Sequence, residues 1–311
     1  MSKILDKLNL TNGKMYLYLH DIFNNRKDTY FNFLSRIIKG RTVPVVPEQT
    51  KLNDEGYYVG TDTYKCDENP NVLEELKKNN WVKDGKIIDI EYKLNQHGFR
   101  SKNFDEILDK DVIIGIGCSI TYGTGLHLEQ TWVHKLAQEM KCEYVNLSAP
   151  GCSTSISSFY CTEYILEKFK NVKGVFLYTP PPNRLELISF TDIDEAQYPI
   201  EEQDVASQPL LSNDYLDTWN QRTLTQTDKK IICGIEHTSF LNYVKDQKLL
   251  EYKCKSINVP FHVIDGNTFW YTPLVLANQS NYTKARDLMH DGPELHTDIS
   301  TEFFNLYNKD K

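Results

Sequence analysis

The run Val112–Ile116 constrains the fold of this chain more than any other segment. Four of its five residues are β-branched, the fifth is a glycine, and Gly117 ends the run. A continuous apolar run of this length is typical of a strand that is covered on both faces. It therefore predicts a parallel sheet with helices on either side.

Strand-like runs and helical patterns alternate along the rest of the chain. Strands are expected at 143–147, 174–178 and 260–265, with a further one near 87–90. Helices are expected at 128–140, 153–170, 236–255 and after Leu295. Short connections between alternating strands and helices are typical of α/β proteins. We expect a three-layer α/β/α sandwich with a mostly parallel central sheet.

The chain divides into an N-terminal extension, residues 1–85, and a larger domain, residues 86–311. Residues 1–45 form a basic, aromatic arm with eight Lys and Arg against three Asp, and residues 46–85 hold a linker and small elements, including a short helix near 72–79. The larger domain carries an acid-rich insertion at 187–232. Two interpretations of the insertion stay open, a wall or lid over the substrate and a solvated surface loop.

Charge and composition exclude several classes of function. The net charge of −8 argues against nucleic acid as a partner, because neutralising phosphates needs a basic surface. Seven cysteines without a C-x-x-C pair, and without a Cys/His cluster at zinc-like spacing, give no reason to expect a metal or another cofactor. No signal-peptide pattern and no stretch of about 18 apolar residues is present, so we expect a soluble, cytoplasmic protein without a membrane span.

A serine follows the central strand directly. Ser119 lies among glycines in the segment 115–125, and the carboxyl ends of parallel strands are where ligands bind in such sheets. A tight turn there would expose its hydroxyl to an incoming carbonyl, as a nucleophile requires. The alternative is that Ser119 caps the helix that follows. This segment alone does not decide between the two.

Two later strand ends carry groups suited to stabilising an oxyanion. Gly151, after the strand at 143–147, has no side chain to block its backbone N–H, and Asn183, after the strand at 174–178, could donate from its side-chain amide. Taken singly, each is also an ordinary turn residue.

An acid and base pair lies near the C-terminus. Asp287 precedes His290 by three residues, so its carboxylate can bond one ring nitrogen and leave the other for Ser119. His296 is the second candidate base, with only Asp291 at a similar local range. We expect His296 to be a helix-face or supporting residue.

The order of these motifs resembles the SGNH (GDSL-like) serine hydrolase superfamily over about residues 87–311. Ser119, Gly151, Asn183 and the Asp287/His290 pair follow the order of the family's blocks, and the segment 98–100 also looks like some members. Two departures stand out. Cys118 replaces the usual aspartate before the serine, and we expect it to face the core; Pro182 and Arg184 flank Asn183 in place of the usual glycine and aspartate.

The resemblance implies an SGNH, flavodoxin-like fold and two-step acyl transfer from an ester. Ser119 would be the nucleophile, Asp287 and His290 its activating pair, and Ser119, Gly151 and Asn183 the oxyanion hole. A small-molecule or glycan ester, including a carbohydrate O-acetyl ester, is the implied substrate. Two alternatives stay open. One is an acyltransferase on the same scaffold, and the other is a silent structural protein, virion-associated in some relatives, that forms homo-oligomer or assembly contacts through residues 1–45.

Overall fold

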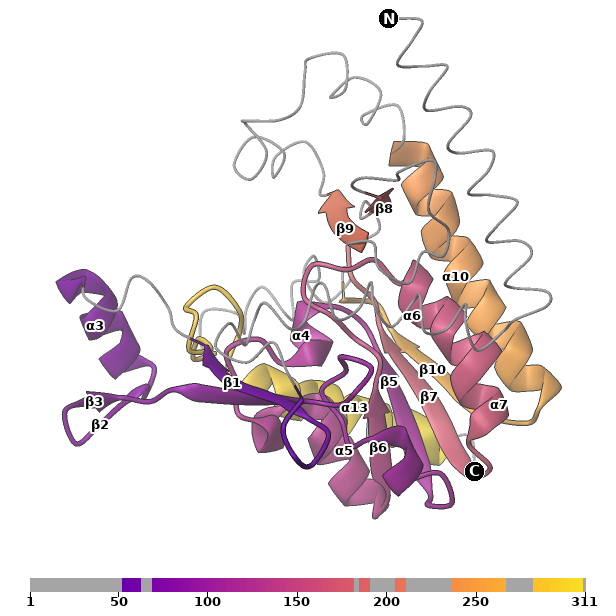
Figure 1. Ribbon diagram of the computed structural model, residues 1–311, viewed down its shortest axis with the longest axis horizontal. Helices are drawn as coiled ribbons and strands as arrows, with labels where there is room; N and C mark the ends of the chain where they lie inside the picture. Colours follow the sequence, from indigo (N-terminus) through magenta and orange to yellow (C-terminus); the bar gives the residue numbers. More distant parts are fainter. Residues whose placement is uncertain are drawn as a thin grey trace, which may run out of the picture.

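The centre of the molecule is a four-stranded parallel sheet (Figure 1). The computed structural model describes residues 52–62, 69–181, 185–190, 205–210, 236–266 and 282–309, with the backbone alone at 62, 185–190, 205–210 and 236–240. The strands of the central sheet are β5 (Val112–Ile116), β6 (Glu143–Asn146), β7 (Val172–Tyr178) and β10 (Phe261–Ile264). Their spatial order is β10-β7-β5-β6 and every pairing is parallel.

Helices cover both faces of this sheet. One face carries α5 (Trp132–Met140) and α13 (Pro293–Lys309). The other carries α10 (Glu236–Ser256) and a continuous helical segment made of α6 (Ser155–Tyr160), the π-helical turn η4 (Cys161–Ile165) and α7 (Leu166–Lys168). All five residues of β5 are buried, with Ile113 packed in one core and Ile114 in the other. The predicted α/β architecture with a parallel sheet is confirmed.

The order of the strands indicates which edge of the sheet is suited to binding a ligand. The chain leaves β5 for β6 on one side and later returns to β7 on the other, so the order of the strands reverses at β5. In doubly wound sheets the crevice at such a reversal, outside the carboxyl ends of the strands, is where ligands bind. The segment that follows β5 at this edge is the short helix α4 (Ser119–Tyr122).

Residues before the sheet fold onto the same body. They form β1 (Tyr58–Asp62), α3 (Pro70–Lys78), β2 (Val82–Lys83), β3 (Lys86–Ile87) and β4 (Ile90–Leu94). Trp81 and Tyr92 belong to a third buried cluster that also contains Tyr122 and Ala285. The boundary expected at 85/86 falls in the turn of the β2–β3 hairpin, and the extension packs directly beside the segment after β5.

Three expected elements differ in detail from the structure. The strand expected near 87–90 is divided between β3 and β4, because the backbone at Ile88 bonds Trp81 and Arg286 instead of a neighbouring strand. The helix expected at 128–140 is broken at Thr131 into the 3-10 turn η3 (Leu128–Gln130) and α5. The short helix expected near 72–79 is present as α3, with Asn69 Oδ1 accepting from Asn71 N at 3.0 Å.

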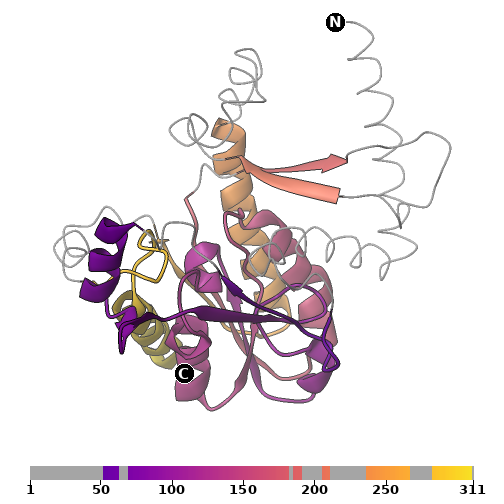
Figure 2. The ribbon, with the colours of Figure 1, turned by 60° about the vertical axis from the view of Figure 1, so that its left-hand side comes forward.

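The acid-rich insertion contributes two described strands. β8 (Leu185–Phe190) and β9 (Val205–Leu210) pair antiparallel. Figure 2 shows them beside the first turns of α10, beyond the end of the sheet that carries α4. The rest of the insertion, the arm at 1–45 and Asn183 lie outside the described residues. No helix in the described ranges is long and apolar enough to cross a membrane.

Candidate active site

The turn between β5 and α4 fixes the position of Ser119. Ser119 is the first residue of α4, Cys118 is its N-cap, and no side chain caps the helix. Gly117 must be glycine, because an added Cβ would lie 2.0 Å from Thr121 Oγ1 and 2.8 Å from Tyr178 O. Because Cys118 is the N-cap and no side chain caps α4, the alternative that Ser119 caps this helix is wrong.

Ser119, His290 and Asp287 form a hydrogen-bonded chain. Ser119 Oγ lies 2.9 Å from His290 Nε2, across 171 residues of sequence. His290 Nδ1 lies 2.5 Å from Asp287 Oδ2, and Asp287 Oδ1 accepts from the backbone N–H of His290 at 3.0 Å. A carboxylate at Nδ1 keeps the proton on that nitrogen and leaves Nε2 free to accept from the serine hydroxyl.

Asp287 is arranged to stay ionised. Its side chain is only 4% exposed, whereas that of His290 is 23% exposed. Burial alone raises the pKa of the Asp287 carboxyl, but hydrogen bonds and charge from His290, with the backbone N–H of Met289, outweigh burial and lower it below the ordinary value. The His290 ring thus has a carboxylate at Nδ1, and its Nε2 faces the Ser119 hydroxyl.

Gly125 joins the loop after α4 to the loop that carries Asp287. It has a φ of +74°, and its carbonyl accepts from Arg286 N at 2.9 Å. An added Cβ would lie 3.0 Å from Ala285 Cβ and 3.1 Å from Asp287 N. Tyr92 supports the same residue, because Gly125 N donates to its hydroxyl oxygen at 2.7 Å.

We predict that Gly125→Ala lowers turnover by about 10- to 100-fold, because the added methyl pushes the Asp287 loop away from Ser119 by a few tenths of an ångström. The cost in stability should be smaller, about 1–3 kcal/mol for a strained backbone. Steady-state kinetics and urea unfolding on the same preparation measure both. A variant with full turnover and reduced stability would show that this contact does not align the site.

A buried guanidinium holds the loop after α4 in place. Arg100 is 1% exposed and donates to the carbonyl oxygens of Gly123 and Leu126, each at 2.7 Å. Its guanidinium also lies 4.4 Å from the centre of the Tyr92 ring. Sequence reasoning gave Arg100 no role beyond the resemblance of segment 98–100, because its partners are backbone carbonyls, which leave no pattern in a sequence.

The glycine predicted for the oxyanion lies at the same edge of the sheet. Gly151 has a φ of +71°, and within the described residues its N–H donates no hydrogen bond. Its loop is tied to α4 by Asn146, whose Nδ2 donates to Thr121 O at 2.9 Å. The N–H of Ser119 is at the first position of a helix, where no intrahelical carbonyl is available. Within the described residues, both N–H groups lie without a hydrogen-bond acceptor in segments that follow strands of the central sheet.

Cys118 is buried, as expected, but its thiol lies beside the serine hydroxyl. It is 3% exposed and packs with Ala149 and Cys152. Ser119 Oγ lies 3.9 Å from Cys118 Sγ, so the two side chains do not point in opposite directions. The reason is local: the backbone at Cys118 is the entry to a helix and does not continue the alternation of the strand.

His296 has a structural role, as expected for the second candidate. Its Nδ1 accepts from Trp132 N at 3.0 Å, at the start of α5. The ring is buried, and burial lowers its pKa to about 3. His290, and not His296, contacts Ser119.

His296 should make stability depend on pH. Between pH 6.5 and 3 the unfolded chain binds a proton that the folded protein does not, so acidification lowers the free energy of unfolding. From pH 7.5 to pH 5 we expect His296 to contribute a loss of about 2 kcal/mol. Urea titrations at both pH values should show a smaller loss for His296→Asn, which keeps an acceptor for Trp132. Equal losses in the two proteins would contradict this assignment.

In the described ranges no three His, Cys, Asp or Glu side chains gather as a metal site would need. Searches with protein-family models and among curated proteins find no match to this chain. The geometry of the site is therefore the basis on which a function is proposed.

Proposed function

We propose that this protein is a serine-dependent ester hydrolase that works through an acyl-enzyme. One observation carries the proposal: Ser119 Oγ, His290 and Asp287 are linked at 2.9 and 2.5 Å at the carboxyl edge of the parallel sheet. A nucleophile, a base and a residue that orients the base, within hydrogen-bond reach of one another, form the minimal constellation for acyl transfer.

The first half-reaction forms the acyl-enzyme. Ser119 Oγ attacks the ester carbonyl while His290 Nε2 takes the hydroxyl proton. The carbonyl oxygen becomes an oxyanion that accepts hydrogen bonds from the N–H groups of Ser119 and Gly151, and His290 returns the proton to the departing alcohol oxygen. Asp287 holds the ring in the tautomer that accepts at Nε2 and stabilises the imidazolium that forms.

The second half-reaction releases the acid. A water replaces the alcohol, His290 removes one of its protons, and the resulting hydroxide attacks the acyl carbonyl. The tetrahedral intermediate collapses, the bond to Ser119 Oγ breaks, and His290 gives that oxygen its proton back. We place Asn183 as a third donor to the oxyanion, on the strength of its order in the sequence.

The SGNH superfamily remains the family that we propose. Support comes from the order Ser119, Gly151, Asp287, His290 along the chain and from an α/β scaffold with the serine directly after a central strand. A silent scaffold protein would have no need for a buried, ionised Asp287 aimed at His290. An acyltransferase would share the acyl-enzyme and differ only in what attacks it.

Hydrolysis of 4-nitrophenyl acetate tests the proposed function. The full-length protein should release 4-nitrophenol with saturation kinetics and with one acetate per nitrophenol. Release at the rate of buffer alone would contradict the proposal. Repeating the assay with an added alcohol distinguishes the acyltransferase, which would form a new ester in place of free acetate.

A further inference from the structure

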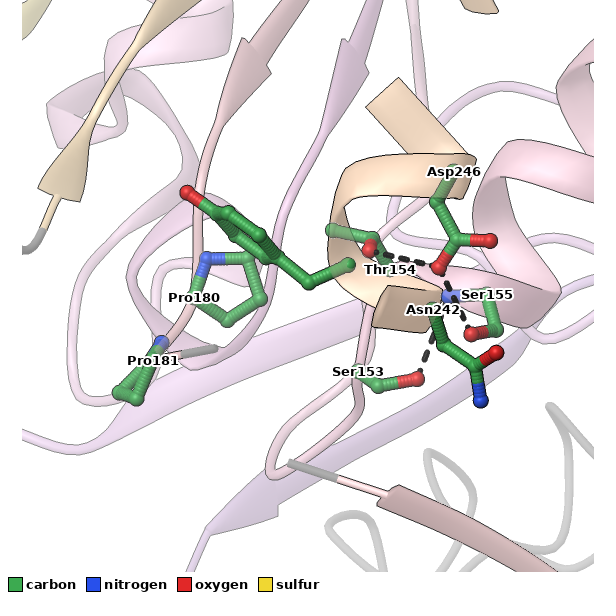
Figure 3. Close-up of a pocket in the computed structure, with 8 residues that line it drawn as sticks. Ser153, Thr154, Ser155, Pro180, Pro181, Asn242 and Asp246 are labelled. Carbon is green, nitrogen blue, oxygen red and sulfur yellow. Dashed lines mark hydrogen bonds between the residues drawn. The ribbon is translucent and has the colours of Figure 1, made fainter. Parts of the chain in front are cut away.

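A small polar pocket lies outside the residues of the proposed catalytic site (Figure 3). Its walls come from the segment after Gly151, the segment after β7 and the helix α10. The hydroxyl residues Ser153, Thr154 and Ser155 lie opposite Asp246. The enclosed space is about 10 Å³, enough for about one water molecule, and its mouth is open to solvent. It fits one hydroxyl group and is too small for an acyl chain.

Two of these walls touch the turn that carries the proposed nucleophile. Cys152, next to Ser153, donates from its thiol to Gly117 O at 3.2 Å and packs against Cys118. On the other side, Pro180 lies two residues after Tyr178, whose carbonyl oxygen would lie 2.8 Å from a Cβ added to Gly117. The pocket is therefore built from segments in contact with the residues just before Ser119.

Asp246 presents one unused carboxylate oxygen. Its Oδ2 accepts from Ser155 Oγ at 2.7 Å and from Thr154 Oγ1 at 3.0 Å. Within the described residues no hydrogen bond reaches Oδ1. Burial raises the pKa of this carboxyl, although the two hydroxyls oppose the shift. Two hydrogen bonds fix the orientation of a half-buried acceptor that still has bonding capacity.

We propose that this pocket binds a hydroxyl-bearing group of the ester substrate, with Asp246 Oδ1 accepting a hydrogen bond from that hydroxyl. The inference rests on the proposed esterase function and makes Asp246 a specificity-determining residue. The pocket also offers the Asn242 amide, which both donates and accepts, and the apolar surfaces of Tyr243 and Pro180. A hydroxyl group can donate to Asp246 and accept from Asn242, whereas an ammonium group only donates.

Three small esters test this inference by kinetics. Ethyl acetate has no hydroxyl, glycerol monoacetate has hydroxyls on the alcohol part, and ethyl lactate has one on the acyl part. We expect wild type to favour one hydroxylated ester at least tenfold in kcat/KM, and the favoured ester identifies which part enters the pocket. Asp246→Asn should remove about tenfold of that preference and change ethyl acetate by less than twofold.

Two further variants test whether the effect is specific to the pocket. Glu251→Gln removes an exposed carboxylate that pairs with Lys248 on the same helix, and it should change none of the three rates. Asn242→Ala truncates a second pocket side chain and should weaken the hydroxylated ester by about threefold. Equal effects of Asp246→Asn on all three esters, or none, would overturn the inference. A preference for acetylcholine over the neutral 3,3-dimethylbutyl acetate, if Asp246→Asn abolished it, would also overturn the inference. The pocket would then bind a cation.

Binding without turnover separates this inference from the proposed function. Saturation-transfer NMR on Ser119→Ala should detect the favoured hydroxylated ester, and adding Asp246→Asn should weaken that binding at least fivefold. Hydrolysis that is indifferent to Asp246 would overturn the pocket assignment and leave the esterase standing. Binding that depends on Asp246, in a protein without hydrolysis, would overturn the esterase and with it the role of the pocket as a substrate site.

Discussion

Ser119→Ala should lower kcat for 4-nitrophenyl acetate by about 10⁴- to 10⁶-fold, to the rate that binding and the oxyanion donors supply alone. The hydroxyl that is lost is the one that lies 2.9 Å from His290 Nε2. The fold should survive, because the change removes one oxygen and one hydrogen bond, which costs about 1 kcal/mol. Single-turnover kinetics at high enzyme concentration measure the residual rate.

Cys118→Ala is the matched control for this variant. Its thiol lies 3.9 Å from Ser119 Oγ, close enough that a thiol nucleophile has to be tested directly. We expect kcat to stay within about threefold of wild type, since the thiol packs with Ala149 and Cys152 whereas His290 Nε2 contacts the serine hydroxyl. Loss of turnover in Cys118→Ala with retention in Ser119→Ala would assign the chemistry to the cysteine.

His290→Ala should be nearly as severe, with a loss of about 10⁴- to 10⁶-fold in kcat. Without the imidazole, the hydroxyl loses the base that takes its proton, and the leaving alcohol loses its acid. The double variant Ser119→Ala, His290→Ala should be no slower than either single variant, because residues that act as a unit are not additive. Rates of all four proteins on one substrate complete this cycle.

His296→Asn serves as the control for the histidine variant. His296 bonds the start of α5 and has no contact with the serine, so its loss should reduce stability and leave kcat near wild type. Independent, multiplying effects of Ser119→Ala and His290→Ala would contradict a shared catalytic unit. A severe kcat loss in folded His296→Asn would move the base to the second candidate.

Much of the sheet could be predicted from the sequence, for a physical reason. β5 is buried on both faces, so its apolar run is continuous and its bounds, Val112–Ile116, match the expected ones. The divided strand at 87–94 and the broken helix at Thr131 were not predictable. Both depend on hydrogen bonds to distant segments, from Arg286 to the carbonyl of Ile88 and from Trp132 N to His296. The local pattern of apolar residues does not reveal such tertiary hydrogen bonds.

The candidate site was predictable where its chemistry depends on local spacing. The three-residue step from Asp287 to His290 is readable because a carboxylate can reach a ring nitrogen within one turn. The supports were missed: Gly125 resembled any loop glycine until its φ of +74° and its contact with the Asp287 loop were known. Asp246 was missed because its hydroxyl partners lie about 90 residues away, at separations of 91 and 92.

Site mapping with a fluorophosphonate probe tests whether Ser119 is the nucleophile. The probe reacts with an activated serine and forms a stable phosphonyl ester, so the adduct can be located by digestion and mass spectrometry. We expect one adduct, on Ser119, that disappears in His290→Ala. An unlabelled wild-type protein, or an adduct on any other residue, would contradict the assignment of Ser119 as the nucleophile.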